Sequence, residues 1–289
     1  MKSRVSISHN NDIAAAINGA LDHLEGLSEL FVGRHVAIKP NDTWASPHDL
    51  TACTQADSLR AVIRFVKNYY PKKITVTGGS GAGETDKIFS YLGLDKVIED
   101  EEVEFIDHNR PPFEAVPLEY GPQGTVMVNE NVLKYDTLIS LAQLKVHEVA
   151  TVTLTMKNIA MSYPAADYYG HPRNRRLHPH NFFSDMQGLI AGMCKRFRID
   201  LGIITGHPVM IERGPVGGKT FEAGLVIASK DCVAADYIGA KLLGFERVGH
   251  IIEAEKLGLG KAHLSNIETI GVQLDEAERI FKEKSKNAQ

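Results

Sequence analysis

Short apolar runs alternate with amphipathic segments through the first half of the chain. His35–Pro40 and Lys73–Gly79 are apolar and short, which predicts buried strands, and Thr54–Tyr70 between them has the periodicity of a helix. Asp86–Leu92 and Val103–Asp107 continue the alternation as a helix and a strand. Because strands that alternate with helices usually pair in parallel, this half of the sequence predicts a doubly wound sheet.

The second half of the chain repeats this alternation. Thr137–Lys145 is its clearest strand, whereas Met156–Arg176 has no clean periodicity and is expected to form a long functional loop or a short irregular helix. Further strands are expected at Val126–Leu133 (an edge strand), Ile199–Gly206, Gly224–Ser229 and Ile267–Val272, and helices at Asp12–Leu24, Asn181–Phe197, Asp231–Leu243 and Val248–Leu257. The whole pattern favours an α/β protein with mostly parallel, doubly wound sheets in two lobes, residues 1–120 and 121–289, with a cleft between them.

Composition and charge narrow the class of protein. Hydrophobic residues make up 43% of the chain and charged residues 24%, as in ordinary globular proteins. The N-terminal residues lack the apolar stretch of a signal peptide and no apolar run is long enough to cross a bilayer, so we expect a cytoplasmic protein without a membrane partner. With a net charge of -4 and one short basic run at Arg173–Arg176, nucleic-acid binding is not expected.

The three cysteines carry no recognisable chemistry in the sequence. Cys53, Cys194 and Cys232 lie far apart and form no C-x-x-C pair. This spacing argues against a disulfide framework and against an iron–sulfur cluster built from this chain. We therefore interpret the cysteines as small buried hydrophobic residues.

Polar residues and glycines follow the first two predicted strands. Ligands bind beyond the carboxyl ends of the strands in open α/β sheets, so these residues are the candidates for substrate and anion binding. They are Lys39, Asn41, Asp42 and Thr43 after the first strand, and Gly79, Ser80 and Gly81 in the GGSGAGE loop after the second. The backbone N–H groups of that loop could hold an anion, or the glycines could simply form a tight turn.

The segment from Lys145 to Asn158 is the strongest candidate for catalysis. Lys145 and His147 have the same parity on an extended chain, so their side chains can point to the same side. Lys157 follows in a threonine-rich apolar setting, where a desolvated lysine can act as a base or a nucleophile. Together with Asp42 these are the expected catalytic residues. The structural alternative is a lysine that reaches solvent beside a cap-forming Asn158.

A histidine- and arginine-rich stretch suggests a second kind of chemistry. His171, His178 and His180 could bind a divalent metal, although no spacing matches a structural zinc site and a solvated basic loop remains the alternative. Arg213 precedes a glycine- and proline-rich turn that is expected to lie close to an anionic ligand or to a neighbouring backbone.

Four motifs in a fixed order resemble a known family. They read K-P-N-D, K-V-H-x-x-x-x-x-T-L-x-M-K-N, R-G-P-x-G-G and V-I-A-S-K-D-x-V-A-A-D. From about Val36 to Val272 the sequence resembles the family catalogued as domain of unknown function 362. Many relatives in that family carry ferredoxin-like cysteine motifs, which this chain lacks, so the resemblance implies no internal cluster and names no reaction.

A second set of residues resembles the nickel-dependent lactate racemases, which hold a pincer nucleotide cofactor on a lysine. Asp42 and Thr43 fall in the segment that corresponds to the first loop of the racemase pattern. His147 and Lys157 are ten residues apart, like the corresponding histidine and lysine of those racemases. The resemblance implies that Lys157 anchors the cofactor and that a later histidine, His171 or His178, binds the metal. Trp44 departs from the pattern, because it offers no arginine for a substrate carboxylate.

These observations support two hypotheses about function. The first is an enzyme that acts on a small carboxylate or phosphate by redox chemistry or by proton abstraction next to a carbonyl, with a bound metal or a lysine-anchored cofactor. The second is a non-catalytic accessory protein that holds a cofactor or metal for a partner redox enzyme. The sequence leaves open whether the protein assembles with copies of itself.

Overall fold

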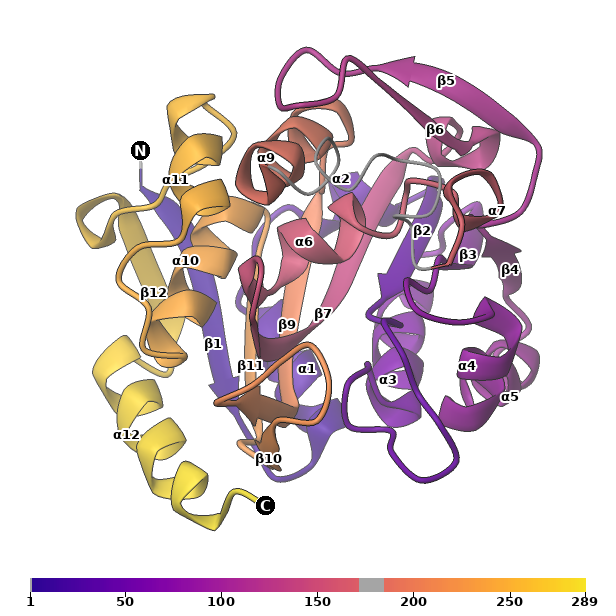
Figure 1. Cartoon of the computed structure of the whole chain (residues 1–289). Helices are drawn as coiled ribbons and strands as arrows, with labels where there is room; N and C mark the ends of the chain where they lie inside the picture. The colour runs from indigo at the N-terminus through magenta and orange to yellow at the C-terminus, as the bar shows by residue number, and fades with distance from the viewer. Residues whose placement is uncertain (1, 172–184) are drawn as a thin grey trace.

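A single ten-stranded sheet forms the centre of the protein (Figure 1). The computed structural model describes residues 2–171 and 185–289. The main row of strands runs in the order β12 (Ile267–Gly271), β1 (Ser3–His9), β11 (Leu225–Ser229), β9 (Leu201–Ile211), β7 (Thr137–His147), β2 (His35–Pro40), β3 (Lys73–Gly78) and β4 (Glu104–Asp107). In this row β11 is antiparallel to both neighbours and every other pair is parallel. The expected α/β fold with a mostly parallel sheet is confirmed.

Two short strands and a separate hairpin complete the β-structure. β8 (Thr151–Thr153) pairs antiparallel with β7, and β10 (Lys219–Phe221) pairs antiparallel with β9. β5 (Phe113–Pro117) and β6 (Thr125–Asn129) form their own two-stranded sheet. The expectation that Val126–Leu133 is an edge strand was therefore wrong for the main sheet, because this segment pairs locally and then continues as the 3-10 turn Glu130–Leu133.

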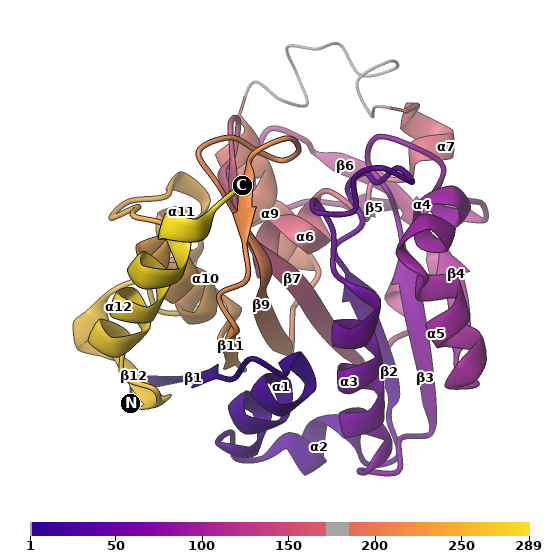
Figure 2. The same ribbon diagram turned by 90° about the horizontal axis from the view of Figure 1, so that it is seen from below.

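Helices cover both faces of the sheet (Figures 1 and 2). One face carries α1 (Ile13–Asp22), α2 (Leu27–Phe31), α3 (Ala56–Lys67), α4 (Thr85–Leu92) and α5 (Leu94–Asp100). The other carries α6 (Thr155–Ala160), α7 (Ala166–Tyr169), α9 (Met186–Arg196), α10 (Cys232–Leu242), α11 (Gly249–Lys256) and α12 (Leu274–Lys284). In the described ranges, no helix is both long and apolar enough to span a membrane.

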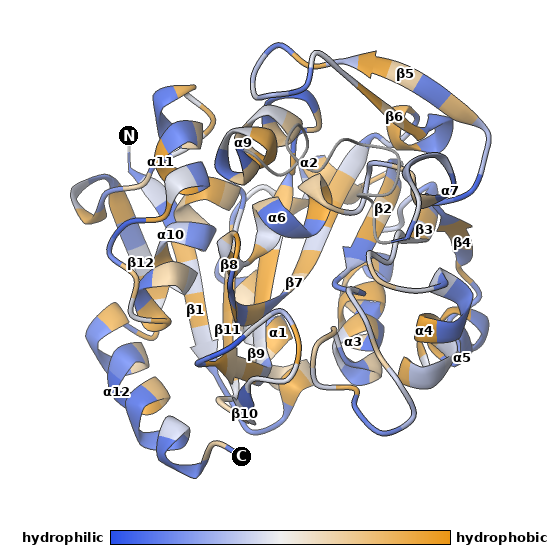
Figure 3. Cartoon of the chain, viewed as in Figure 1, coloured by the Kyte–Doolittle hydropathy of each residue, from blue (hydrophilic) through white to orange (hydrophobic). Residues whose placement is uncertain are grey.

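Strand β7 shows why the central strands are apolar at nearly every position. Ile139 and Leu141 pack into the core beneath α1 and α3, whereas Leu138 and Leu144 pack into the core beneath α6 and α9. A parallel sheet covered on both faces buries both sets of side chains, so alternation of polar and apolar residues disappears. Figure 3 shows this contrast between the hydrophobic central strands and the largely hydrophilic outer helix α12.

The order of the strands reverses between β2 and β7. From β2 the chain moves through β3 to β4 on one side, and β7 then returns to lie against the opposite side of β2. Such a reversal opens a crevice at the carboxyl ends of the two strands, where open α/β sheets bind ligands. Because strands from both sides of residue 120 share this sheet, the division into two lobes stays a prediction.

The segment Met156–Arg176 begins as two short helices. Its described part contains α6 and α7, which agrees with the expectation of short irregular helix, and residues 172–184 are outside the described part of the chain. The sequence analysis did not predict β1, although this strand lies between β12 and β11 in the main row of the sheet. Its pairing partners begin more than 200 residues later, so no local pattern indicates them.

Candidate active site

A cavity of about 150 Å³ lies in the crevice between β2 and β7. It is lined by residues from four parts of the chain: the segment after β2, the loop after β3, the β7–β8 hairpin, and α6 with the turn that follows it. The lining residues are Asn41, Asp42, Thr43, Gly79, Gly81, His147, Thr153, Lys157, Asn158, Met161 and Ser162. Eight of these were expected from the sequence, and their convergence follows from the position of the reversal in strand order.

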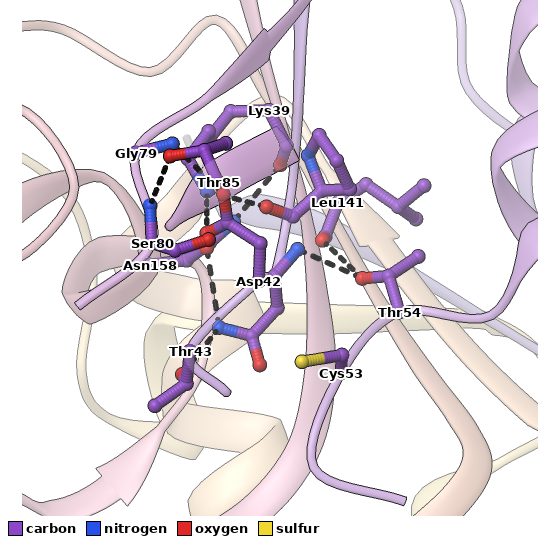
Figure 4. A network of polar contacts seen from close by, with 12 residues as sticks. Lys39, Asp42, Thr43, Cys53, Thr54, Gly79, Ser80, Thr85, Leu141 and Asn158 are labelled. Atoms are coloured by element: carbon purple, nitrogen blue, oxygen red, sulfur yellow. Dashed lines mark hydrogen bonds and ion pairs between the residues drawn. The ribbon is translucent and has the colours of Figure 1, made fainter. Parts of the chain in front are cut away.

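One residue of the cavity lining, Asp42, belongs to a buried ion pair. Lys39 Nζ lies 2.6 Å from Asp42 Oδ1, and both side chains are almost fully excluded from solvent. The second oxygen of Asp42 accepts a hydrogen bond from the Gly79 backbone N–H at 2.8 Å (Figure 4). Asp42 therefore joins the loop after β2 to the loop after β3. Lys39 does not line the cavity. Its positive charge balances the negative charge of Asp42, which does line it.

The glycine-rich loop packs tightly against the segment after α6. A Cβ atom on Gly79 would lie 2.2 Å from Ser162 Oγ and 2.6 Å from the Ser162 carbonyl oxygen, so only glycine fits there. The Ala82 N–H donates to the Thr43 carbonyl at 3.2 Å, and the Ser80 N–H donates to the Thr85 hydroxyl at 3.3 Å. These bonds give the loop the character of a tight internal turn. An anion-binding role for Gly79, Ser80 and Gly81 stays a prediction.

Helix α6, which carries Lys157, is held at its start by a carboxylate from another helix. Asp236 on α10 accepts hydrogen bonds from the Thr155 N–H at 2.8 Å, the Thr155 hydroxyl at 2.5 Å and the Met156 N–H at 2.9 Å. Burial raises the pKa of Asp236 to about 7, and the three donors act in the opposite direction. The carboxylate satisfies N–H groups that a helix start leaves without intrahelical partners.

Asn158 fixes the same helix to two strands of the sheet. Its Nδ2 donates to the Lys39 carbonyl at 2.9 Å and to the Ser140 hydroxyl at 3.1 Å. Its Oδ1 accepts from Asn41 Nδ2 at 3.3 Å (Figure 4). Asn158 is thus a buried cross-link between α6, β2 and β7, and it lies inside α6 rather than at its cap, where the structural alternative placed it.

His147 is held as a neutral hydrogen-bond donor. Its Nδ1 accepts hydrogen bonds from the N–H groups of Val149 and Ala150, both at 3.1 Å. Because backbone N–H groups only donate, Nδ1 is unprotonated and the proton of the neutral ring sits on Nε2. Burial, and then the charges of Lys157 and Lys145, lower the pKa of His147 to about 2. The ring therefore stays neutral at physiological pH and offers one N–H.

Lys145 and Arg213 do not line the cavity, although the sequence analysis expected a catalytic role for Lys145 and an anion-binding role for Arg213. Lys145 Nζ donates to the carbonyls of Ala52 at 2.5 Å and Pro215 at 3.3 Å, and its side chain does not line the cavity. Burial lowers the pKa of Lys145 to about 8. Arg213 is exposed, pairs with Glu148 at 3.1 Å and also lies outside the lining. Direct catalysis by Lys145 and anion binding by Arg213 stay predictions that this geometry does not favour.

The expected metal ligands are not assembled in the described residues. His171 follows α7 and does not line the cavity, while His178 and His180 lie outside the described residues. Within residues 2–171 and 185–289, no group of three or more histidine, cysteine or carboxylate side chains could hold a metal ion. All three cysteines in these ranges are buried, in agreement with their interpretation as small hydrophobic residues.

Several residues of the site were missed in the sequence. Met161 and Ser162 line the cavity from the turn after α6, and neither follows a predicted strand. Asp107 and Asn109 support the glycine-rich loop: Asp107 accepts from the Thr85 hydroxyl at 3.0 Å, and Asn109 donates to the Ser80 carbonyl at 3.0 Å. Asp107 is the last residue of β4 and Asn109 follows it, so the rule that identified the other strand ends could have found them.

The protein has an α/β fold with an open, mostly parallel sheet and a polar crevice at the point where the strand order reverses. The family described as "Domain of unknown function (DUF362)" matches residues 36–241, and the chain belongs to this family. A comparison with curated proteins gives no match.

Two solved structures are distantly similar to this chain. The lactate racemase apoprotein from Thermoanaerobacterium thermosaccharolyticum is 12% identical, with a TM-score of 0.44 over 73% of this chain and 51% of its own. A crystal structure of a protein from Thermotoga maritima is 10% identical, with a TM-score of 0.41 over 70% of this chain and 52% of its own. The chain thus spans about half the length of each of these proteins.

Proposed function

We propose that the protein is an enzyme that binds a small carboxylate and moves a proton on it. The observation that carries this proposal is that Lys157 and the neutral donor His147 line one cavity. Proton transfer is favoured over redox chemistry because a lysine amine can take up and release a proton, a neutral imidazole N–H can stabilise developing negative charge, and neither side chain carries electrons. The cavity lies where the sheet's strand order reverses, the usual ligand position in this architecture.

The size and polarity of the cavity indicate the class of ligand. A space of about 150 Å³ suits a molecule of roughly six non-hydrogen atoms, the size of benzene. His147 provides an N–H donor for an oxygen of the ligand, and Lys157 provides a base for a neighbouring C–H group. Asn41 Oδ1 and Thr153 Oγ1 are buried without a hydrogen-bond partner, and both residues line the cavity. A hydroxyl on the ligand would satisfy one of these oxygen atoms, so a small hydroxy or oxo acid fits best.

The two central side chains have complementary roles in the proposed reaction. Lys157 in its amine form takes the proton from the carbon next to the carboxylate or carbonyl; the C–H bond breaks and its electron pair moves into an enolate. His147 donates its Nε2–H to the oxygen on which negative charge develops. A neutral imidazole can stabilise such an oxygen without transferring its own proton. The ammonium formed on Lys157 then returns the proton to carbon.

The described residues do not fit a metal-bound cofactor held through His147. Nδ1 of this ring is occupied by two N–H donors, and Nε2 carries the proton, so neither nitrogen presents a lone pair to a metal. Metal binding by His171, His178 and His180, and a covalent group on Lys157, stay predictions. The steps proposed above use only the side chains of the cavity.

Deuterium exchange tests the proposal directly. The protein is incubated in D2O with small 2-hydroxy and 2-oxo acids, and NMR detects deuterium on C2 of the hydroxy acids and on C3, next to the carbonyl, of the oxo acids. We expect exchange that falls by about 100-fold or more in Lys157→Ala, because general base catalysis contributes at least that factor. Lys134→Ala is the matched control, since Lys134 is exposed and pairs only with surface groups.

The other outcomes separate the two hypotheses. Exchange that persists in Lys157→Ala would refute the role of this lysine. Binding of an acid without any exchange, measured by titration calorimetry, would instead favour the accessory protein that holds a ligand for a partner redox enzyme. His147→Gln retains an amide N–H donor and is expected to keep more activity than His147→Ala.

A further inference from the structure

A second and larger cavity, of about 460 Å³, lies beside His147. The end of β7, the start of β8, the turn after β9 and the segment after α10 form its walls. Among the described residues that line the two cavities, His147 is the one that both have in common. The side chain that we assign to the substrate oxygen therefore also borders this larger space.

The β7–β8 hairpin holds the His147 ring and also forms one wall of the larger cavity. Thr151 pairs with His147 across the hairpin, and both residues line the cavity. The turn between them supplies the two N–H groups that bind Nδ1 of the ring. Thr151 has a φ of 71°, in the left-handed region that a β-branched residue rarely adopts. Such backbone strain is typical of functional sites, where the surrounding structure maintains it.

The R-G-P-x-G-G motif forms another wall of the larger cavity. A Cβ atom on Gly214 would overlap the Val146 carbonyl oxygen, so only glycine allows this turn to approach β7 so closely. The Gly214 carbonyl accepts a hydrogen bond from the Glu148 N–H at 3.0 Å. Gly214, Val146 and Glu148 all line the cavity. The motif thus lies against a neighbouring backbone, and this contact brings the turn to the cavity beside His147.

The apolar side chains of the larger cavity are only partly covered by the protein. Ile211, Leu243 and Phe245 line it, and each of them remains half-buried. A ligand that covers these side chains removes apolar surface from water, which favours binding. The cavity therefore offers a binding surface for an apolar group.

The charged residues of this cavity do not favour a second anionic group on the ligand. Two carboxylates line it, those of Glu148 and Glu212, and no described lysine or arginine does. Glu148 pairs with Arg213 at 3.1 Å, and Glu212 pairs with Lys219 at 2.8 Å. The lining therefore favours an uncharged, apolar group over a phosphate or a second carboxylate.

We propose that the larger cavity binds the side chain of the substrate, which is a 2-hydroxy or 2-oxo acid with an aliphatic chain longer than that of lactate. This inference rests on the proposed function of the smaller cavity, which has room for roughly six non-hydrogen atoms and thus for the acid group with its reacting carbon. A longer chain has to leave that space, and His147 marks the place where a second space begins. The His147 N–H binds the substrate oxygen while the chain extends past the ring into the larger cavity.

A series of chain lengths tests this inference in the wild-type protein. Lactate, 2-hydroxybutyrate, 2-hydroxyhexanoate and 2-hydroxyoctanoate are incubated with the protein in D2O, and NMR measures kcat/KM for exchange at C2. Titration calorimetry measures the affinity for the same acids. We expect kcat/KM and affinity to rise by about two- to fourfold for each added methylene group until the cavity is filled. Lactate and 2-hydroxyoctanoate should compete, because their acid groups share the smaller cavity.

Substitutions in the lining test where the chain binds. Leu243→Gln replaces an apolar side chain with a polar one of similar size, and it should lower the ratio of kcat/KM for 2-hydroxyoctanoate to that for lactate by about tenfold. Ile211→Thr provides a second test if Leu243→Gln does not fold, with an expected loss of about threefold in the same ratio. Leu264→Gln is the matched control, because Leu264 is 43% exposed and lines neither cavity.

The outcomes separate this inference from the proposed function. Exchange and affinity that do not depend on chain length, or equal ratios in Leu243→Gln and Leu264→Gln, would overturn the inference, while exchange on lactate would leave the proposed function standing. Binding of 2-hydroxyoctanoate that does not compete with lactate would also overturn it, because the long acid then occupies a separate site. Affinity that rises with chain length and falls in Leu243→Gln, without exchange on any acid, would support the chain site and refute proton transfer.

Discussion

Asp236 accepts two hydrogen bonds from Thr155, a residue 81 positions earlier in the chain, one from its backbone N–H and one from its hydroxyl. The pair joins α10 to the first turn of α6, two residues before Lys157. The last motif of the family and the lysine motif therefore meet in space. The position of Lys157 relative to the sheet depends on this contact and on the opposite attachment through Asn158.

Replacing Asp236 with Ala should destabilise the protein and disturb Lys157. Three buried donors would lose their acceptor, so we expect the free energy of unfolding to fall by about 3 kcal/mol or more. Asp236→Asn keeps one acceptor oxygen and should cost about half as much. Denaturant unfolding measures both. Asp22→Ala, at an exposed aspartate, is the control; a loss no larger than that of the control would contradict the role of Asp236.

The Lys39–Asp42 ion pair should show strong coupling. Lys39→Met leaves the Asp42 carboxylate buried without its counter-charge, and we expect a loss of about 3–5 kcal/mol in unfolding free energy. Adding Asp42→Asn removes the uncompensated charge, so the double variant should regain part of that stability. A double-mutant cycle from urea unfolding gives the coupling energy. Strictly additive effects would show that the two groups do not depend on each other.

Gly79→Ala should be far more damaging than alanine at a glycine in open space. The new Cβ would meet the Ser162 backbone, which cannot move without shifting the segment after α6. We expect a loss of about 2 kcal/mol in unfolding free energy and weaker ligand binding. Gly124→Ala is the matched control, because nothing lies within 4 Å of its Cβ position. Equal effects of the two substitutions on the thermal midpoint would refute this packing argument.

His207 should make stability depend on pH in the neutral to alkaline range. Hydrogen bonds to Asp57 at 3.0 Å and Glu222 at 2.5 Å raise the pKa of His207 to about 10. The unfolded side chain titrates near its ordinary value of about 6.5, so the folded state binds the proton more tightly. The stabilisation is therefore complete below about pH 6.5 and is lost as the pH rises towards 10.

The comparison with His207→Gln tests this pH dependence. Because both carboxylates are largely exposed, solvent screening limits the expected difference from wild type to about 1 kcal/mol near neutral pH and below. The difference in unfolding free energy should close as the pH approaches 10. A difference that stays constant across this range would mean that His207 contributes by packing rather than by charge.

The sequence by itself determined the class of fold and much of the cavity lining. The alternation of apolar strands and helices specifies a parallel sheet, and the carboxyl ends of parallel strands lie on one edge. Polar residues and glycines at or directly after the ends of strands, such as Asn41, Gly79 and His147, therefore had to gather on that edge. The threonine-rich apolar residues around Lys157 also predicted its apolar setting. These properties depend on near neighbours in the chain, which a sequence displays directly.

Only the tertiary structure decided which strands are neighbours and what supports each side chain. The pairing of β2 with β7 fixed the position of the cavity, and no local pattern encodes a contact across so many residues. Lys145 and His147 share a parity, yet only His147 lines the cavity, because the Lys145 ammonium group instead donates to the carbonyls of Ala52 and Pro215. Asp236 acquires its role because α10 packs against α6 in the folded chain. Such contacts depend on the burial of distant surfaces, so they exist only once the whole core has formed.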